Sequence, residues 1–235
     1  MIGKGKSISH GVAALEYDLA KEINGQAVAT EIARHELYGC TGAEMVQEMK
    51  PYHIDFPNVK NNCLRFEVSP SIEESATFTD ADWAELGNDF MQRMGLANHQ
   101  YIIIRHSGTE SKKEQAHLHI LANRVSLSGE LYRDNWIGKK ATEAANAIAK
   151  ERNFVQSQDI GKVNKAEIKE AMDGVLKKMQ GFDFTKFKEE LGKRGFKVRE
   201  ARASTGKLNG YYVTARSGTE YKASEIAVSY THLRA

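Results

Sequence analysis

The residues best suited to chemistry are two histidines that stand one residue apart, His117 and His119, in the apolar stretch EQAHLHILANRV. Because side chains alternate along a β-strand, both imidazoles would share one face with Leu121. The opposite face then consists of apolar core residues, namely Leu118, Ile120 and Ala122. Two adjacent imidazoles suit a divalent metal or a phosphate group. The pattern also fits two partly buried histidines bonded to backbone carbonyls, so both interpretations stay open.

A second strand should bring a third histidine to the same place. Residues 99–106 (HQYIIIRH) are rich in β-branched side chains, which favours a strand. The polar segment SGTESKKEQ separates this strand from the one with the histidine pair. The two strands predict an antiparallel hairpin at the centre of a sheet, with His106 near His117 and His119.

The surrounding segments predict an α+β fold. Apolar residues at helical spacing predict a helix over residues 10–22, which includes Tyr17. Further helices are expected over residues 28–38, 41–50, 79–94 and 139–152, the second of these opening on a capping box from Thr41 to Glu44 and the third on the N-cap Thr79. A strand is expected over residues 63–69. We expect a central antiparallel sheet that carries the histidine strand, with helices packed mainly on one side.

Charge divides the chain into an acidic and a basic part. Residues 1–159 hold 17 Lys and Arg against 22 Asp and Glu, whereas residues 160–222 hold 15 against 8. The basic part predicts helices over 164–179 and 184–193, followed by short strands between glycine-containing turns. We therefore expect one large domain over residues 1–159 and a small basic α+β unit over 160–228. The basic unit is either a polyanion-binding surface or a solvated helical face.

Composition excludes several classes of protein. The chain has no apolar run of about 18 residues, and its N-terminus lacks the apolar segment of a signal peptide. Cys40 and Cys63 show no CxxC spacing, which argues against a disulfide framework and a cysteine zinc site. We expect a cytoplasmic protein without membrane insertion. Residues 229–235 resemble a translated sequencing-adaptor remnant, so we expect a non-native tail there and leave His232 out of the chemistry.

The motifs together resemble a known group of nucleases. A His-hydrophobic-His strand followed by Asn-Arg, with a tyrosine on an N-terminal helix, resembles the relaxases, the mobilisation nucleases of plasmids and integrative mobilisable elements within the HUH endonuclease superfamily. The opening GKGKSISHGVAALEYDLAKE is similar to the start of one mobilisation-protein subgroup. The segments LRFEVSPSIEE, HLHILANRVSLSGELYRDNW and GKLNGYYVTARSGTEYKASE agree with it. The resemblance covers most of the chain.

The resemblance implies a relaxase domain in residues 1–159 that nicks single-stranded DNA at an origin of transfer. Tyr17 would be the nucleophile and would form a covalent 5′-phosphotyrosine. One divalent ion, Mg²⁺ or Mn²⁺, would be held by His106, His117 and His119 and would polarise the scissile phosphate. The expected nucleic-acid contacts are Lys4 and Lys6 beside the nucleophile helix, Asn123 and Arg124 at the end of the motif, and Lys177 and Lys178 in the basic unit. Accessory mobilisation and coupling proteins would be partners.

Three departures from the relaxase pattern bear on activity. Relatives carry His-x-Asp at the position of His106, whereas this chain has Gly108 in place of the acid that would orient a histidine. They also carry a further histidine at the position of Gln115, and the loop from residue 107 to 116 is longer than expected. Glu110 or Glu114 would be able to restore the carboxylate. The base that would activate Tyr17 is not identified by the sequence.

Three other functions compete with this interpretation. Rolling-circle replication initiators share the histidine strand, but their tyrosine follows the histidines, whereas Tyr17 precedes them. An accessory DNA-binding mobilisation protein would carry a degenerate metal site, in agreement with Gly108. A metal-dependent hydrolase of small phosphoesters would need neither Tyr17 nor the basic unit. Tyr38 is the next candidate for the nucleophile, and the histidines expected to be structural or exposed are His10, His35, His53 and His99.

Overall fold

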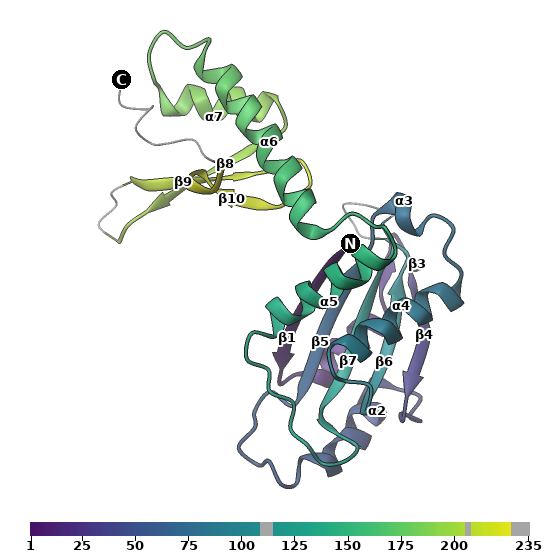
Figure 1. The fold of residues 1–235 in the computed structure, drawn as a ribbon. Coiled ribbons are helices and arrows are strands. Elements are labelled where there is room, and N and C mark those ends of the chain that lie inside the picture. The colour runs from purple at the N-terminus through teal and green to yellow at the C-terminus, as the bar shows by residue number, and fades with distance from the viewer. Residues whose placement is uncertain (109–114, 205–207, 227–235) are drawn as a thin grey trace. The chain divides into compact units, whose positions relative to one another are not determined.

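The computed structural model describes residues 1–108, 115–204 and 208–226 and divides into two compact units (Figure 1). The first unit spans Met1–Ser157, and the second begins at Gln158. Among the described residues, no helix is both long and apolar enough to cross a membrane.

The first unit is built on a five-stranded antiparallel sheet. Its strands are β1 (Ile2–Ile8), β4 (Ala29–His35), β5 (Cys63–Ser69), β6 (His99–His106) and β7 (His117–Ser126), in the spatial order β1-β5-β7-β6-β4. The predicted α+β class and the central antiparallel position of the histidine strand are therefore confirmed, with β7 in the middle of the sheet. The predicted strands over residues 63–69 and 99–106 have the expected bounds.

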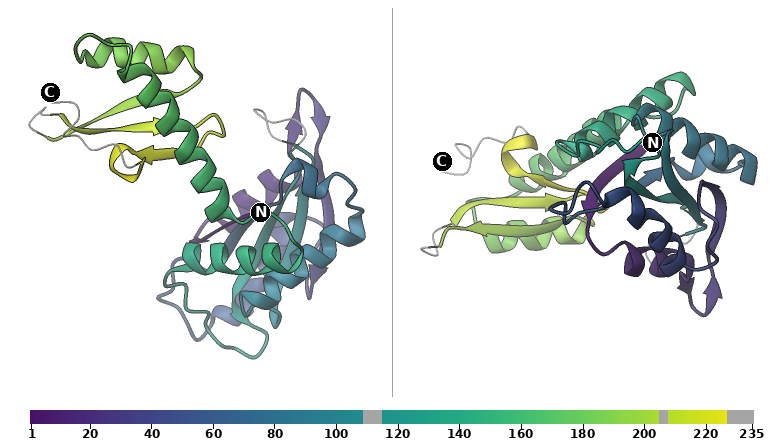
Figure 2. Two further views of the ribbon diagram at one scale, coloured as in Figure 1. Left: turned by 45° about the horizontal axis from the view of Figure 1, so that its top comes forward. Right: turned by 90° about the horizontal axis from the view of Figure 1, so that it is seen from below.

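Helices lie on both faces of this sheet (Figure 2), whereas the sequence predicted them mainly on one side, because the contribution of the short helices α1 and α2 to the histidine face depends on tertiary packing. The two longer ones, α4 (Asp80–Arg93) and α5 (Ile137–Glu151), cover one face and bury the main apolar core. The shorter α1 (Gly11–Leu19) and α2 (Gly42–Met49) pack with Ile102, Ile104 and Leu121 on the face that carries the histidines. Short elements complete the unit, namely β2 (Glu22–Ile23), β3 (Gln26–Ala27), η1 (Lys50–His53) and α3 (Ile72–Ser75).

Helix capping sets two of these helices as the sequence predicts. Thr41 accepts a hydrogen bond from the backbone of Glu44, and the Glu44 carboxylate accepts one from the backbone of Thr41. Thr79 caps α4 in the same reciprocal way with Asp82. Each pair satisfies backbone N–H groups that a helix start would otherwise leave unpaired.

The helix predicted over residues 28–38 is wrong, because this segment forms the edge strand β4. It pairs antiparallel with β6, from Ala29 opposite His106 to His35 opposite Tyr101, with a bulge between Glu31 and Ala33. Pairing with a central strand satisfies the backbone over its whole length, and this tertiary gain overrides a weak helical pattern. The bulge breaks the alternation of buried and exposed residues that would have identified a strand.

Strand β1 was not predicted, because its sequence IGKGKSI lacks apolar alternation. Gly3 and Gly5 face α5 so closely that a methyl group at Gly3 would lie 2.4 Å from the carbonyl oxygen of Ala141. Lysines occupy the other face of this edge strand at positions 4 and 6. Close helix packing therefore takes the place of apolar side chains here.

The second unit has its own sheet and core. Helices α6 (Ser157–Leu176) and α7 (Phe184–Lys193) pack against a three-stranded antiparallel sheet in the order β10-β9-β8, formed by β8 (Lys197–Arg202), β9 (Leu208–Thr214) and β10 (Glu220–Lys222), followed by η2 (Ala223–Ile226). Phe187 and Leu191 of α7 are fully buried in this core. The assignment of distinct roles to the two parts of the chain stays a prediction.

Candidate metal centre

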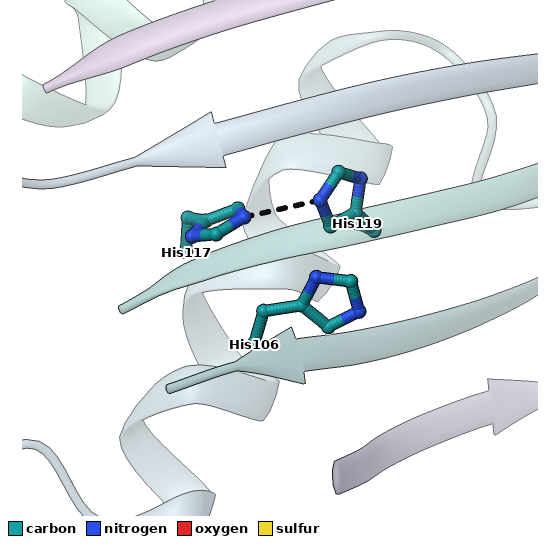
Figure 3. Close-up of side chains that lie close together, drawn as sticks. All are labelled: His106, His117 and His119. Atoms are coloured by element: carbon teal, nitrogen blue, oxygen red, sulfur yellow. Dashed lines mark hydrogen bonds between the residues drawn. The ribbon is translucent and has the colours of Figure 1, made fainter. Parts of the chain in front are cut away.

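Three histidines converge at the paired ends of β6 and β7 (Figure 3). His106 lies directly opposite His117 in the antiparallel register, and His119 is two residues along the same face. One nitrogen atom of each ring lies within 4.8 Å of the corresponding atoms of the other two. The predicted convergence of the three imidazoles is therefore present, and this cluster could hold a metal ion.

Hydrogen bonds to backbone carbonyls orient two of the rings. His117 donates from Nδ1 to the carbonyl oxygen of Gln115 at 3.1 Å, so its Nε2 accepts the hydrogen bond from Nε2 of His119 at 3.1 Å. His106 donates from Nε2 to the backbone carbonyl of Asp18 at 2.7 Å, which leaves its Nδ1 with a lone pair. Backbone acceptors of this kind fix the tautomer and orientation of metal-binding histidines.

Burial keeps two of the imidazoles in their neutral form. The pKa of His119 is lowered to about 2, first by burial and then by the neighbouring His106 and His117. Burial also lowers the pKa of His106, against the opposing effect of its bond to the Asp18 carbonyl. Neutral imidazole is the form that binds metals, so burial favours the metal-binding form of His106 and His119.

A buried carboxylate, Asp18 of α1, supports the cluster from above the sheet. Its side chain is 2% exposed and accepts hydrogen bonds from Nε and Nη2 of Arg65 at 3.0 and 2.5 Å. Its Oδ1 lies 3.8 Å from Nδ1 of His119. Asp18 therefore lies beside two of the three histidines: its backbone carbonyl accepts the hydrogen bond from His106, and its carboxylate lies near the His119 ring.

Asp18 is a buried polar neighbour of the cluster that the sequence interpretation missed, although a signal was present. The buried residues of α1 are Gly11, Ala14, Leu15 and Asp18, which follow helical spacing. A carboxylate on the apolar stripe of a helix requires a partner, because an unpaired buried charge is costly. That position alone indicated a buried polar site beneath α1.

Tyr17 lies on α1, one residue before Asp18, with its side chain 56% exposed. The ammonium group of Lys21 donates a hydrogen bond to the Tyr17 hydroxyl at 2.6 Å and lies 4.8 Å from the centre of its ring. The charge of Lys21 is also among the causes that lower the pKa of His106. Lys21 therefore contacts the tyrosine and acts electrostatically on His106, and sequence reasoning did not single it out.

A groove runs from the cluster to the edge of the sheet. Its volume is about 220 Å³, and it is lined by Lys4, Gly5, Lys6, Arg65, Phe66, Glu67 and His119. Cross-strand pairing produces it, because Lys4 pairs with Glu67 and Glu67 pairs with His119. The Lys4 ammonium contacts the Glu67 carboxylate at 2.9 Å, and Lys6 is exposed. Both predicted N-terminal lysines thus lie beside the cluster.

Asn123 and Arg124 are held in internal contacts. Asn123 is fully buried, where it accepts from His53 Nε2 at 2.6 Å and donates to the carbonyl of Met49 and to Gln100. Arg124 pairs with Asp134 at 2.7 Å and donates to the backbone carbonyls of Asn61 and Tyr132. These contacts hold both side chains within the fold, and their predicted role toward DNA stays a prediction.

Lys177 and Lys178 lie in the second unit, just after α6, and both are exposed. They line a hollow of about 970 Å³ within that unit. The charged residues around it include the basic Lys169, Arg194 and Arg216 and the acidic Glu167, Glu170 and Asp173. The surface is therefore mixed in charge, and the DNA-binding role of the two lysines stays a prediction.

The remaining predicted positions lie apart from the cluster or outside the described residues. His99 is buried and donates a hydrogen bond from Nδ1 to the backbone carbonyl of Asn123 at 2.9 Å. His35 donates from Nδ1 to the backbone carbonyl of His99. His10 precedes α1 and is exposed. Glu110 and Glu114 fall outside the described residues. Gln115, in place of a further histidine, donates to Ser69 at 3.2 Å.

Comparisons with known proteins give both a family and a set of similar folds. Three solved structures of the conjugative relaxase TrwC in complex with oriT DNA were found. The metal-bound one has 11% sequence identity and a TM-score of 0.39, over 88% of this chain and 74% of that one. The metal-free one has 10% identity and a TM-score of 0.39 over the same shares, and the copper-bound one has 13% identity and a TM-score of 0.36 over 88% and 75%. No curated protein sequence matches the chain.

A family model matches more than half of the sequence. The match covers residues 17–154, from the tyrosine on α1 through the three histidines to the end of the first unit, and the model describes a MobA/VirD2-like relaxase nuclease domain. The chain therefore belongs to the MobA/VirD2-like relaxase family.

Proposed function

We propose that this relaxase nicks single-stranded DNA at an origin of transfer and stays attached to the new 5′ end through Tyr17, as a step in the mobilisation of a plasmid or integrative element. The observation that carries the proposal is the position of α1. This helix holds Tyr17 at the surface while the next residue, Asp18, contacts His106 and His119 directly. The proposed nucleophile, Tyr17, is therefore the chain neighbour of the residue that lies beside two of the candidate metal ligands.

The residues present fit a divalent cation. His106, His117 and His119 offer one ring nitrogen each, and the two hydrogen-bonded Nε2 atoms of His117 and His119 are 3.1 Å apart. Imidazole ligands favour transition metals over Mg²⁺, so of the two expected ions Mn²⁺ suits this donor set better. A cation bound there would offset the charge of the scissile phosphate and so make its phosphorus a better electrophile.

In the proposed reaction, the Tyr17 oxygen attacks the phosphorus and the bond from phosphorus to the 3′ oxygen breaks. The leaving 3′ oxygen takes up a proton from solvent and becomes a 3′ hydroxyl. The phenol proton passes to solvent, and the product is a 5′-phosphotyrosine. Lys21 supports this step because its ammonium donates to the attacking oxygen at 2.6 Å, where negative charge is needed.

The groove beside His119 would receive the DNA backbone. Lys4, Lys6 and Arg65 line it and offer positive charge to phosphate oxygens, which positions a strand without reading its sequence. In the second unit, Lys177 and Lys178 are the proposed additional backbone contacts. Such contacts would add affinity that depends on salt and hardly on base sequence.

Covalent capture of DNA tests the proposal. The full chain would be incubated with a 5′- and 3′-labelled single-stranded origin oligonucleotide and Mn²⁺ or Mg²⁺, and a denaturation-resistant adduct sought. We expect an adduct with wild type and with Tyr38→Phe, a matched change at an exposed tyrosine, and none with Tyr17→Phe. A nick without an adduct in Tyr17→Phe would agree with slow attack by water. An adduct that forms equally with Tyr17→Phe would exclude Tyr17 as the nucleophile.

A further inference from the structure

Trp136 is exposed to an unusual degree for its residue type. It is 80% exposed, whereas the other tryptophan of the chain, Trp83, is 2% exposed. Tryptophan is highly buried on average, because its large apolar surface favours burial. Trp136 also has a positive φ of 58°, a left-handed conformation that is unfavourable for a residue with a bulky side chain. The fold therefore presents this ring to solvent at a cost to stability.

The position of Trp136 is fixed by the start of α5. Its backbone carbonyl accepts the hydrogen bond of Lys140 N at 2.9 Å, and the following residue, Ile137, is buried. The ring is thus attached to a rigid helix end rather than to a long loop. Tryptophan has only two side-chain torsion angles, so its ring loses little conformational freedom when it binds a flat partner.

The side chains around Trp136 are mainly basic. Arg133, Lys139 and Lys140 lie within four residues of it, and the Lys140 ammonium is held by the Arg133 carbonyl at 2.8 Å. The nearby acid Asp134 is paired with Arg124 at 2.7 Å. Lys139 has Glu143 at 3.8 Å, a separation typical of a weak exposed pair. This surface therefore combines an aromatic ring with net positive charge.

The start of α5 lies against the strand that forms the edge of the groove. A methyl group at Gly138 would be 3.5 Å from the carbonyl oxygen of Gly5, and Gly5 lines the groove together with Lys4 and Lys6. Thr142, one turn further on, donates to the carbonyl of Gly3 at 3.1 Å. The start of α5 packs on the face of β1 opposite Lys4 and Lys6, so Trp136 and the groove lie on either side of this edge strand, and a strand of DNA that passes over the edge of the sheet would reach both.

We propose that Trp136 is a stacking site for one base of single-stranded DNA that passes over edge strand β1, across that strand from the phosphate contacts of Lys4 and Lys6. The inference rests on the proposed function for the presence of DNA in the groove. An aromatic ring beside basic side chains is the combination that binds single strands, because every base has a flat face and every linkage a negative charge. Duplex DNA keeps its bases stacked inside and does not offer them to such a ring.

Intrinsic fluorescence tests this directly, because Trp83 is buried and Trp136 is the exposed tryptophan. The Tyr17→Phe full chain would be titrated with an unlabelled oligo-dT in EDTA, so that neither nicking nor metal binding contributes. We expect oligo-dT to quench the emission and an abasic oligonucleotide of equal length, which has the charge but no bases, to leave it nearly unchanged. Trp136→Phe should retain only the emission of Trp83, with no quenching.

Affinity provides a second readout. Trp136→Ala should weaken oligo-dT binding about 5- to 150-fold, the range expected for loss of one stacked base. Tyr38→Ala, a matched truncation of an aromatic residue that is 76% exposed, should bind as wild type does. Because the ring is exposed, Trp136→Ala should fold, and a circular dichroism spectrum would verify this.

The outcomes separate this inference from the proposed function. If Trp136→Ala bound oligo-dT with wild-type affinity and oligo-dT did not quench the emission of Trp136, the stacking site would be overturned. Adduct formation by the wild-type chain would then leave the nuclease proposal standing. If oligo-dT quenched the emission of the chain with Trp136 and Trp136→Ala bound oligo-dT more weakly, the stacking site would be supported. If the wild-type chain at the same time formed no adduct under any condition, the nuclease proposal would be weakened. Equal quenching by the abasic oligonucleotide would also overturn stacking, because charge alone would then explain the signal.

Discussion

Replacing Asp18 by asparagine would show whether its buried charge supports the histidine cluster. Asparagine keeps the shape of the side chain but removes the negative charge that Arg65 contacts through Nε and Nη2. Removing one partner of a fully buried ion pair costs about 3–5 kcal/mol. Because the Arg65 side chain is 21% exposed and water can reach it, we expect the free energy of unfolding to fall by about 2–3 kcal/mol.

The same change should weaken metal binding. Without the Asp18 carboxylate, the uncompensated charge of Arg65 would lie next to His119, since Arg65 Nη2 is 3.4 Å from His119 Nδ1. Loss of a group that orients a metal ligand lowers metal affinity about 10- to 100-fold. That range corresponds to about 1.4–2.7 kcal/mol of binding free energy.

Calorimetry with Mn²⁺ and urea unfolding of the metal-free chain would measure the two effects. Asp80→Asn is a matched control, because Asp80 also pairs with an arginine, Arg105, but is 66% exposed. Exposed pairs contribute about 0–1 kcal/mol, so this variant should keep its stability and its metal affinity. If Asp18→Asn bound Mn²⁺ as tightly as wild type and unfolded at the same urea concentration, the supporting role of Asp18 would be refuted.

Three further changes test other parts of the site. Lys21→Met should slow adduct formation about 10- to 100-fold while DNA binding persists. Lys21→Arg should recover most of the rate, because it keeps the positive charge beside Tyr17. Equal single-turnover rates for wild type, Lys21→Met and Lys21→Arg would contradict this role. Because the pKa of His119 is lowered in the folded chain, below about pH 6.5 the unfolded chain takes up a proton at His119 that the folded chain does not. The metal-free protein should therefore lose up to about 1.4 kcal/mol of stability for each pH unit below that value. In urea unfolding at pH 7 and pH 5, the stability of His119→Gln should depend less on pH than that of wild type. Replacing both Lys177 and Lys178 by alanine should reduce the slope of log affinity against log salt by about 1.4 for single-stranded DNA, and an unchanged slope would place them on a solvated face.

Local patterns predicted the part of the site that lies on one hairpin. The bounds of β6, the alternation along β7 and the convergence of His106 with His117 and His119 all follow from strand geometry, because paired residues of adjacent antiparallel strands share a face. The capping boxes at Thr41 and Thr79 likewise depend on residues three positions apart. Interactions of this short range can be inferred from the sequence with few alternatives.

The edge strands required tertiary information. Residues 29–35 form β4 because β6 offers a partner for their backbone, and a bulge removes the alternation that would mark a strand. β1 forms because Gly3 allows α5 to approach closely, a condition set by residues more than 130 positions away. Neither segment shows a regular alternation of apolar and polar residues that would predict a strand from its own sequence.

The sequence by itself determined that three imidazoles meet and that a tyrosine precedes them on a helix. Only the tertiary structure decided what surrounds them. The packing of α1 on the histidine face brings Asp18 to His106, 88 residues further along the chain, and to Arg65 on β5. No periodicity encodes such a contact, because it depends on which face of the sheet a short amphipathic helix covers, and burial of that carboxylate is stable only where a cation and imidazoles already lie.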